Sequence, residues 1–409
     1  MIIKANTRTF FVFFVFIYFL IFPIGFEVLG ESGKYVNNYD ISSYNNHFII
    51  FYFSIQAILG FIIGLKISRF ETCASIIPKP TKVKSANIAI IVNALVSILV
   101  ALLFFIEDIK IVISDYESNY GHSFNSSGFS FLKLNFYVCL SLLISYSFYY
   151  NNKLKGLFYF SLLVFLGFIT SDKNPIVLGV LAVLSNSYIY SKGVGLKKSI
   201  LIIFYVLIFI VFTKLFSLFR SSGVGFDELV YVLSNFKLTN IDGAGPYFSI
   251  IYLLENPTEY YGITYLNDIF SIIPKFIYHE RPDGTSLLFA KDVIKNWNAG
   301  EGLGFSPIAE GLNNFGYHMV VFHFLIVGIF WGWWWTFVHF VIRILFKSNI
   351  ELYYIFYRVV GVYLLLMFFR GSGLGFIKSS LYALLPILFV HIIIYMVFSN
   401  EKKSNTMGS

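Results

Sequence analysis

The sequence predicts an all-α, polytopic integral membrane protein with about ten transmembrane helices and one long extracytoplasmic loop containing short interfacial helices. Of its 409 residues, 57% are hydrophobic and only 13% are charged, and the mean hydropathy is +0.74. Phe contributes 49 residues and Tyr 29, more aromatic surface than a soluble core of this size could bury. The apolar residues also gather in runs of roughly 20, the length that a helix needs to cross the hydrocarbon core of a bilayer.

Each apolar run is predicted to be a helix, because a backbone in lipid must satisfy its own hydrogen bonds. The runs cover residues 9–30, 47–66, 86–106, 131–150, 154–170, 173–191, 198–219, 317–346, 351–370 and 376–398. The first run follows Lys4 and Arg8 as in a signal peptide. It is long and lacks a small-residue cleavage site, which favours a retained signal anchor.

The basic residues predict the orientation, since Lys and Arg accumulate on the cytoplasmic side of short connections. They cluster in one set of connections, as at 66–84 and 192–198, whereas the alternate set carries acids such as Glu107 and Asp115. Both termini are therefore expected to be cytoplasmic. The net charge of +8 is interpreted as part of this topology and not as a surface for nucleic acid.

This orientation divides the chain into three parts. Residues 1–219 hold seven transmembrane helices, 220–316 form a long outer loop, and 317–409 hold three more helices and a cytoplasmic tail. Connections longer than about 15 residues are usually functional, so the loop is the expected active-site region. Within it, the apolar segments 226–236, 247–254 and 265–273 predict short helices along the membrane surface.

Redox, metal and nucleotide sites are not expected. Cys73 and Cys139 form neither a disulfide framework nor a metal-ligand spacing, and no pair of histidines has convincing metal spacing with carboxylate support. The glycines at 300–304 and 371–375 lack the preceding strand of a dinucleotide loop, so they predict flexible backbone near a substrate.

The end of the outer loop carries three motifs in order. They are Tyr-His-Glu-Arg-Pro-Asp-Gly at 278–284, a glycine-rich segment leading to Ser-Pro-Ile-Ala-Glu at 306–310, and Asn-Asn-Phe-Gly at 313–316. This order resembles the Wzy-type O-antigen polymerases, the oligosaccharide repeat-unit polymerases of bacterial surface glycans. Arg-Gly-Ser at 370–372 also looks like the family. One departure is that no Arg in the outer loop is followed eleven positions later by Gly, a spacing that some members carry.

The resemblance implies a multi-pass glycosyltransferase of the bacterial inner membrane that acts in lipopolysaccharide biosynthesis. It would transfer the growing glycan from a polyprenyl diphosphate carrier, such as undecaprenyl diphosphate, to the terminal sugar of another lipid-linked unit at the periplasmic face. The expected partners are these lipid-linked oligosaccharides, membrane lipid and, as a further candidate, a chain-length regulator. No cofactor, metal or nucleic acid is expected.

Such a reaction needs cations around the departing diphosphate and a base near the acceptor hydroxyl. Arginine suits the first task because its planar fork pairs with phosphate oxygens. Arg220, Arg281 and Arg370 are the diphosphate-binding candidates. The alternative for Arg220 and Arg370 is snorkelling to lipid phosphates, and for Arg281 a local ion pair.

Glu310 is the first candidate for the base, with His279 and His318 as runners-up; the alternatives are a helix-start carboxylate and structural histidines. Within the matching motifs, Ser306, Asn313 and Tyr278 are candidates for binding substrate. Three histidines that fall within predicted spans are interpreted as packed: His323, His339 and His391.

Two rival functions remain open. An O-antigen ligase would use the same donor but transfer the glycan to lipid A core. A flippase or exporter of lipid-linked oligosaccharides would be expected to have two related halves and a charged central cavity, whereas this sequence concentrates its polar residues in one outer loop.

Overall fold

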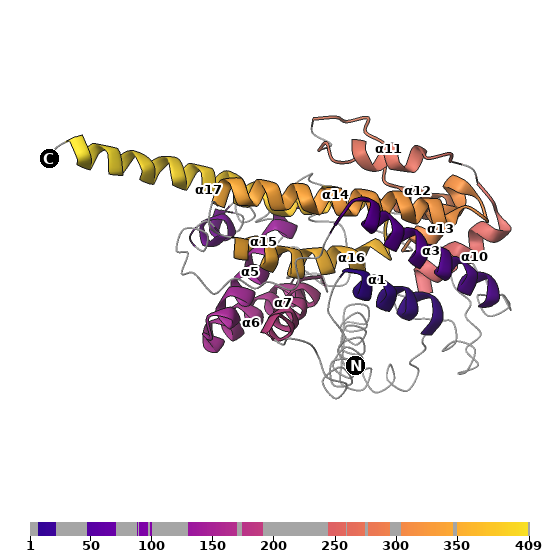
Figure 1. Cartoon of the computed structure of the whole chain (residues 1–409), viewed down its shortest axis with the longest axis horizontal. Coiled ribbons are helices and arrows are strands. Elements are labelled where there is room, and N and C mark those ends of the chain that lie inside the picture. The colour runs from indigo at the N-terminus through magenta and orange to yellow at the C-terminus, as the bar shows by residue number, and fades with distance from the viewer. Residues whose placement is uncertain are drawn as a thin grey trace.

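The computed structural model describes residues 7–21, 47–70, 88, 90–96, 99, 130–169, 174–190, 244–258, 260–274, 277–294, 304–346 and 350–407. These residues are helical or lie in turns, and none of them forms a strand, which confirms the all-α prediction for this part of the chain (Figure 1). Within these described ranges, three helices are long and apolar enough to cross a membrane: Phe48–Ile67, Val320–Leu345 and Gly375–Ile393.

The helices form a bundle with a group of shorter helices at one end (Figure 1). The bundle contains α1 (Thr7–Phe16), η1 (Ile17–Ile21), α3 (His47–Ile67), α5 (Ser130–Tyr149), α6 (Lys153–Ile169), α7 (Asn174–Tyr190), α14 (Val320–Phe346), α15 (Ile350–Phe356), η4 (Tyr357–Gly361), α16 (Val362–Phe368) and α17 (Gly375–Met407). The shorter helices are α10 (Ala244–Glu255), α11 (Ile263–Phe270), α12 (Thr285–Val293) and α13 (Pro307–Phe315), here called the cap.

Eight of the predicted spans coincide with described helices, each starting within a few residues of the predicted position. The span at 351–370 is one helix interrupted by the π-helical turn η4, and only the first part of the 9–30 span is described. The predicted span at 198–219 lies outside the described residues, as do most of 86–106 and the loop segment 226–236. A count of ten spans therefore stays a prediction.

The closest helix pair, α3 and α14, is built on glycine. A β-carbon on Gly64 would lie 2.4 Å from the carbonyl oxygen of Leu325, and one on Gly328 would lie 2.6 Å from that of Phe61. Such distances leave no room for a side chain, so the two backbones touch. Gly60 and Gly332 extend the contact by one turn on either side, giving the Gly-xxx-Gly spacing that lets membrane helices approach closely.

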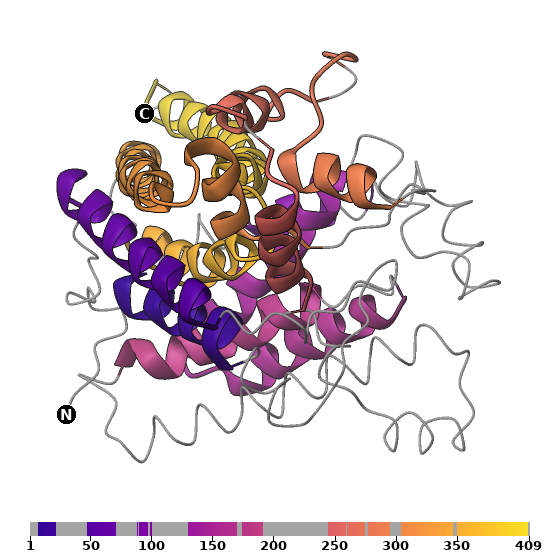
Figure 2. The same cartoon turned by 90° about the vertical axis from the view of Figure 1, so that its right-hand side faces the viewer.

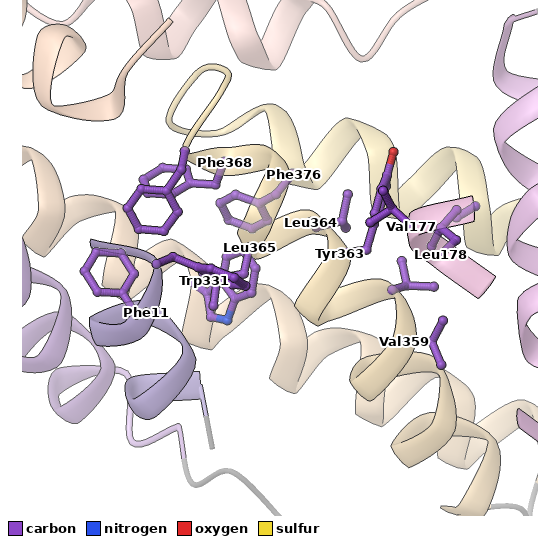
Figure 3. Close-up of a cluster of buried hydrophobic side chains, with 14 of the residues drawn as sticks. Phe11, Val177, Leu178, Trp331, Val359, Tyr363, Leu364, Leu365, Phe368 and Phe376 are labelled. Carbon is purple, nitrogen blue, oxygen red and sulfur yellow. The ribbon is translucent and has the colours of Figure 1, made fainter. Parts of the chain in front are cut away.

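The centre of the bundle is filled by large apolar side chains (Figure 3). Trp331 of α14 packs on Phe376 of α17, with ring centroids 4.7 Å apart, and Phe11 of α1 contacts Phe368 of α16. All four are buried. The polar side chains discussed next lie at the end of the bundle, under the cap.

One cap helix differs from its prediction. The segment 247–254 was expected to lie along the membrane surface, but Tyr247, Phe248 and Ile251 of α10 are buried between α13 and the bundle. The apolar stretch of α10 therefore fills the core of the cap. In contrast, α11 exposes Ile263, Leu266 and Phe270 on its outer side, as an interfacial helix would.

Candidate functional site

The cap helices converge on the turn between α16 and α17. In the end-on view the cap lies over the end of the bundle, with α13 next to α14 and α10 (Figure 2). The amide of Phe305 donates to the carbonyl of Arg370 at 3.4 Å, which ties the start of α13 to the turn. Two sequence segments that are far apart, 305–315 and 370–374, thus form one site.

The residues at 306 and 307 account for the start of helix α13. Ser306 is the N-cap, and its hydroxyl accepts from the amide of Ile308 at 3.1 Å, while Pro307 occupies the first helical position. The amide of Ser306 donates to the hydroxyl of Ser249 of α10 at 3.0 Å. Ser306 therefore starts and anchors the helix that carries Glu310. This capping role accounts for Ser306 without the substrate contact that its motif predicts.

Glu310 lies on the buried side of α13 and is 0% exposed. The amide of Gly373 donates to its Oε2 at 2.5 Å. Its other oxygen, Oε1, is buried and has no hydrogen-bond partner among the described residues. A buried acceptor without a donor is costly in a protein interior, so such an atom is a strong candidate for contact with a bound molecule.

The surroundings of Glu310 favour its protonated, neutral form. Burial raises the pKa of Glu310 to about 8, with a further contribution from the charge of Asp268, although hydrogen bonds from Thr264 and Gly373 oppose this shift. A carboxyl group with a pKa in this range can take up or release a proton near neutral pH, as a general base must.

Asp268 of α11 is the neighbouring buried carboxylate and is fully engaged. Its Oδ2 accepts from the amide of Leu374 at 2.9 Å, and hydrogen bonds from Ser372 and the amide of Gly375 also stabilise its ionised form. These groups begin α17, so Asp268 caps the helix and complements the positive end of its dipole. Burial still raises the pKa of Asp268 to about 6. Its role is to fasten α11 to α17.

His323, in the first turn of α14, completes the cluster. Its Nδ1 lies 2.6 Å from the hydroxyl of Tyr265, and the two rings stack with centroids 5.7 Å apart. The side chain is 0% exposed, and its Nε2 has no hydrogen-bond partner among the described residues. His323 was interpreted as packed; it is buried, but it also presents a second polar atom without a partner.

Gly373 lies between these side chains. A β-carbon there would be 3.0 Å from Cε1 of His323 and 3.2 Å from Oε2 of Glu310. The histidine and the carboxylate therefore meet around one point at the backbone of the turn. Nε2 of His323 is bonded to that Cε1, and Oε1 of Glu310 belongs to the same carboxyl group as that Oε2.

The three candidate arginines have different surroundings. Nη1 of Arg281 donates to the carbonyls of Ser271 and Ile273, at 2.6 and 3.0 Å, and so holds the C-terminal end of α11. Arg370 lies in the turn that carries Gly373, beside the Glu310 cluster. Arg220 lies outside the described residues. Of the ion pairs considered for Arg281, Asp283 is paired with Lys291 at 2.6 Å.

The remaining candidates lie around this cluster or away from it. Asn313 accepts from the hydroxyl of Thr258 at 3.0 Å and from the amide of Tyr260 at 2.8 Å, which ties the loop before α11 to α13. Tyr278, His279 and His318 are exposed on the cap surface. Within the described residues, no group of three His, Cys, Asp or Glu side chains could hold a metal ion.

Of this buried cluster, the sequence motifs single out Glu310 but not Asp268, Tyr265 or His323. A signal for the first two existed, because Tyr265 and Asp268 are three residues apart and share one face of a short amphipathic helix. His323 had no such signal, since a histidine in an apolar run is most simply a packed side chain. Comparisons of the chain with protein-family models, curated proteins and solved structures find no match.

Proposed function

We propose that this protein is a membrane glycosyltransferase that polymerises polyprenyl-diphosphate-linked oligosaccharide repeat units, with Glu310 as the catalytic base. The observation that carries the proposal is the buried carboxyl group of Glu310 under the cap, with one oxygen that has no partner in the described part of the chain, next to the turn that contains Arg370. The motif resemblance to the Wzy-type polymerases supports it, because Glu310 and Arg370 both lie in the matching segments.

In this proposal the chain lies in the bacterial inner membrane with about ten spans and both termini in the cytoplasm. The cap then faces the periplasm, where lipid-linked repeat units are displayed. The exposed apolar side of α11 would lie in the membrane interface and bring the site close to the diphosphate of a lipid-anchored substrate.

The proposed reaction is a single displacement. Oε1 of ionised Glu310 takes the proton of the acceptor hydroxyl, and the hydroxyl oxygen forms a bond to the first anomeric carbon of the donor glycan. The bond from that carbon to the diphosphate oxygen breaks, and polyprenyl diphosphate leaves with the bonding electrons. Inversion at the anomeric carbon is the expected result of one displacement.

Arg370 is the better placed of the two described arginines for the leaving diphosphate, since it begins the turn that contains Gly373. Arg281 is partly engaged, because its Nη1 holds two carbonyls of α11. Arg281→Ala would therefore loosen α11 as well as remove a charge, so a loss of activity in this variant would not by itself show diphosphate binding.

The test uses a deletion strain that carries the wild-type gene, Glu310→Gln or Glu280→Gln. Glu280 is an exposed carboxylate of the same loop and serves as the matched control. On a gel of surface lipopolysaccharide, the wild type and Glu280→Gln should restore the ladder. Glu310→Gln should leave core capped with single repeat units, because the amide cannot take the proton.

Other outcomes would contradict the proposal. A full ladder from Glu310→Gln at equal protein levels would show that Glu310 is not the base. A deletion strain with no capped core would indicate the ligase or the flippase instead of a polymerase. The packed aromatic centre of the described bundle gives the flippase no support, since a carrier needs a polar path through the membrane.

A further inference from the structure

A chain of hydrogen bonds with a defined direction connects α11, α13 and α14. At its start, Oδ1 of Asn314 in α13 accepts from the backbone amide of Gly262, the residue before α11, at 3.0 Å. A backbone amide can only donate, so this contact fixes which end of the Asn314 side chain is the carbonyl. Nδ2 of Asn314 then donates to the hydroxyl of Thr264 at 2.7 Å.

The same Asn314 side chain also lowers the pKa of Tyr265, as a donor to the phenol oxygen does. An amide nitrogen is a donor only, so the Tyr265 oxygen accepts at this contact. The phenol proton must then be donated elsewhere, and the acceptor within reach among the described residues is Nδ1 of His323, at 2.6 Å. Burial, with the charge of Glu310, raises the pKa of Tyr265, which keeps its proton in place.

The direction of these bonds sets the tautomer of the histidine. If Nδ1 of neutral His323 accepts, its single ring proton is on Nε2. Nε2 is then a buried donor, and Oε1 of Glu310 is a buried acceptor; neither has a partner among the described residues. A hydroxyl group accepts one hydrogen bond and donates another, as a water molecule does, so a sugar hydroxyl would complement both atoms and take the place of water there.

We infer that Asn314 and Tyr265 hold His323 in its Nε2-protonated form, so that His323 and Glu310 together bind the acceptor hydroxyl of the incoming sugar. This inference rests on the proposed function and adds the groups that recognise the acceptor. His323 orients the oxygen of the hydroxyl, Glu310 takes its proton, and Asn314 and Tyr265 are positioning residues.

The tautomer is tested first, without any activity measurement. Protein labelled with ¹⁵N-histidine is placed in nanodiscs, and the side-chain nitrogen resonance of His323 is assigned by its loss in His323→Gln. The expected wild-type signal is that of a neutral ring protonated at Nε2. Tyr265→Phe should convert it to a mixture of tautomers, and Tyr260→Phe, which removes a hydroxyl elsewhere in the cap, should not. A wild-type ring protonated at Nδ1, or no change in Tyr265→Phe, overturns the inference.

The proposed hydroxyl site is tested by placing a methyl group beside His323 and Glu310. Gly373→Ala places a methyl group 3.0 Å from Cε1 of His323 and 3.2 Å from Oε2 of Glu310, without removing any polar group. Gly371→Ala is the matched control in the same turn, where the nearest atom is the carbonyl oxygen of Met367 at 3.3 Å. With purified lipid-linked repeat units, Gly373→Ala should lower kcat/KM by about 100-fold, as for loss of one transition-state donor, while Gly371→Ala stays near the wild type.

The histidine itself is tested by a conservative replacement. His323→Gln keeps an N–H donor and should retain activity to within about tenfold, whereas His323→Leu should lose about 100-fold. Equal activity of Gly373→Ala and the wild type would show that the region holds only water or nothing. If the wild-type protein does not join lipid-linked repeat units at all, the proposed function fails, and the tautomer measurement still decides the hydrogen-bond chain.

Discussion

At the scale of single residues, Glu310 and Asp268 differ in the hydrogen bonds that they accept from the described residues. Asp268 and Glu310 are both buried carboxylates beside the turn at 370–374. Asp268 accepts several donors at the start of α17, which accounts for its burial. Among the described residues, Oε1 of Glu310 has no hydrogen-bond partner, and the pKa of Glu310 is raised more strongly than that of Asp268; this combination is typical of groups that react.

The pKa of Glu310 predicts opposite pH dependences for activity and stability. A base must be ionised, so polymerisation should rise about tenfold per pH unit up to about pH 8 and then level off. The folded pKa lies above that of an unfolded glutamate, so the folded state binds the proton more tightly. The contribution of this tighter proton binding to the stability of the folded state is complete below the ordinary pKa of 4.5 and is lost as the pH rises through the folded pKa of about 8.

Both dependences are measurable on the purified protein between pH 6.5 and 9. This range lies above the pKa of about 6 for Asp268, so changes in Asp268 contribute little. Thermal unfolding should begin at lower temperatures as the pH rises for the wild type, and the slope should be smaller for Glu310→Gln, which cannot ionise. A wild-type midpoint that rises with pH across this range would contradict the assignment.

At the scale of elements, the backbone contact between α3 and α14 positions His323. Gln56 of α3 reinforces it, since its Oε1 accepts from the amide of Val321 at 3.0 Å and caps the start of α14. His323 follows two residues later and is 0% exposed. The orientation of this histidine therefore depends on how closely α3 and α14 approach.

Gly64→Ala should separate these helices. Its β-carbon would lie 2.4 Å from the carbonyl of Leu325 and 2.8 Å from the amide of Ile329, and backbone atoms cannot move aside as a side chain can. We expect a loss of about 1–3 kcal/mol in the free energy of unfolding, the usual cost of overpacking. Denaturation in detergent, followed by the fluorescence of the tryptophans in α14, would measure it.

Gly179→Ala in α7 is the matched control. Its β-carbon would meet the ring of Phe160 at 3.0 Å, which can rotate, and alanine favours a helix by about 1 kcal/mol over glycine. This variant should be close to the wild type in stability or slightly more stable. Equal destabilisation by both substitutions would show that the glycine contact between α3 and α14 has no special role.

At the scale of the whole molecule, the proposed topology places the cap on the periplasmic side of the inner membrane. The connection between α5 and α6 lies in a predicted cytoplasmic loop, and Asn152 within it is exposed. Tyr261, at the start of α11, is 80% exposed on the cap. The two positions are thus accessible reporters for opposite sides of the membrane.

Single cysteines at these positions, in a chain with Cys73 and Cys139 replaced by alanine, would establish the orientation. In intact cells without an outer-membrane barrier, a membrane-impermeant maleimide should label Tyr261→Cys and leave Asn152→Cys unlabelled. After the inner membrane is permeabilised, both should react. Labelling of Asn152→Cys before permeabilisation would reverse the topology and remove the cap from the periplasm.

The class of the protein and the positions of its helices follow from the sequence. An apolar run of about 20 residues has few alternatives to a membrane helix, because the chain itself supplies every backbone hydrogen bond. The start of α13 also depends on neighbouring residues alone, since Ser306 and Pro307 act within one helical turn. These features depend on neighbouring residues, and neighbouring residues are what a sequence displays.

The composition of the site was decided by the tertiary structure. Glu310 meets Gly373 across 63 positions, Asp268 meets Leu374 across 106, and Tyr265 meets His323 across 58. The burial of α10 in the cap has the same origin, since its apolar stretch is compatible with either a membrane surface or a protein core. Pairings over such separations depend on how helices pack, so the sequence alone identified Glu310 but could not show which groups surround it.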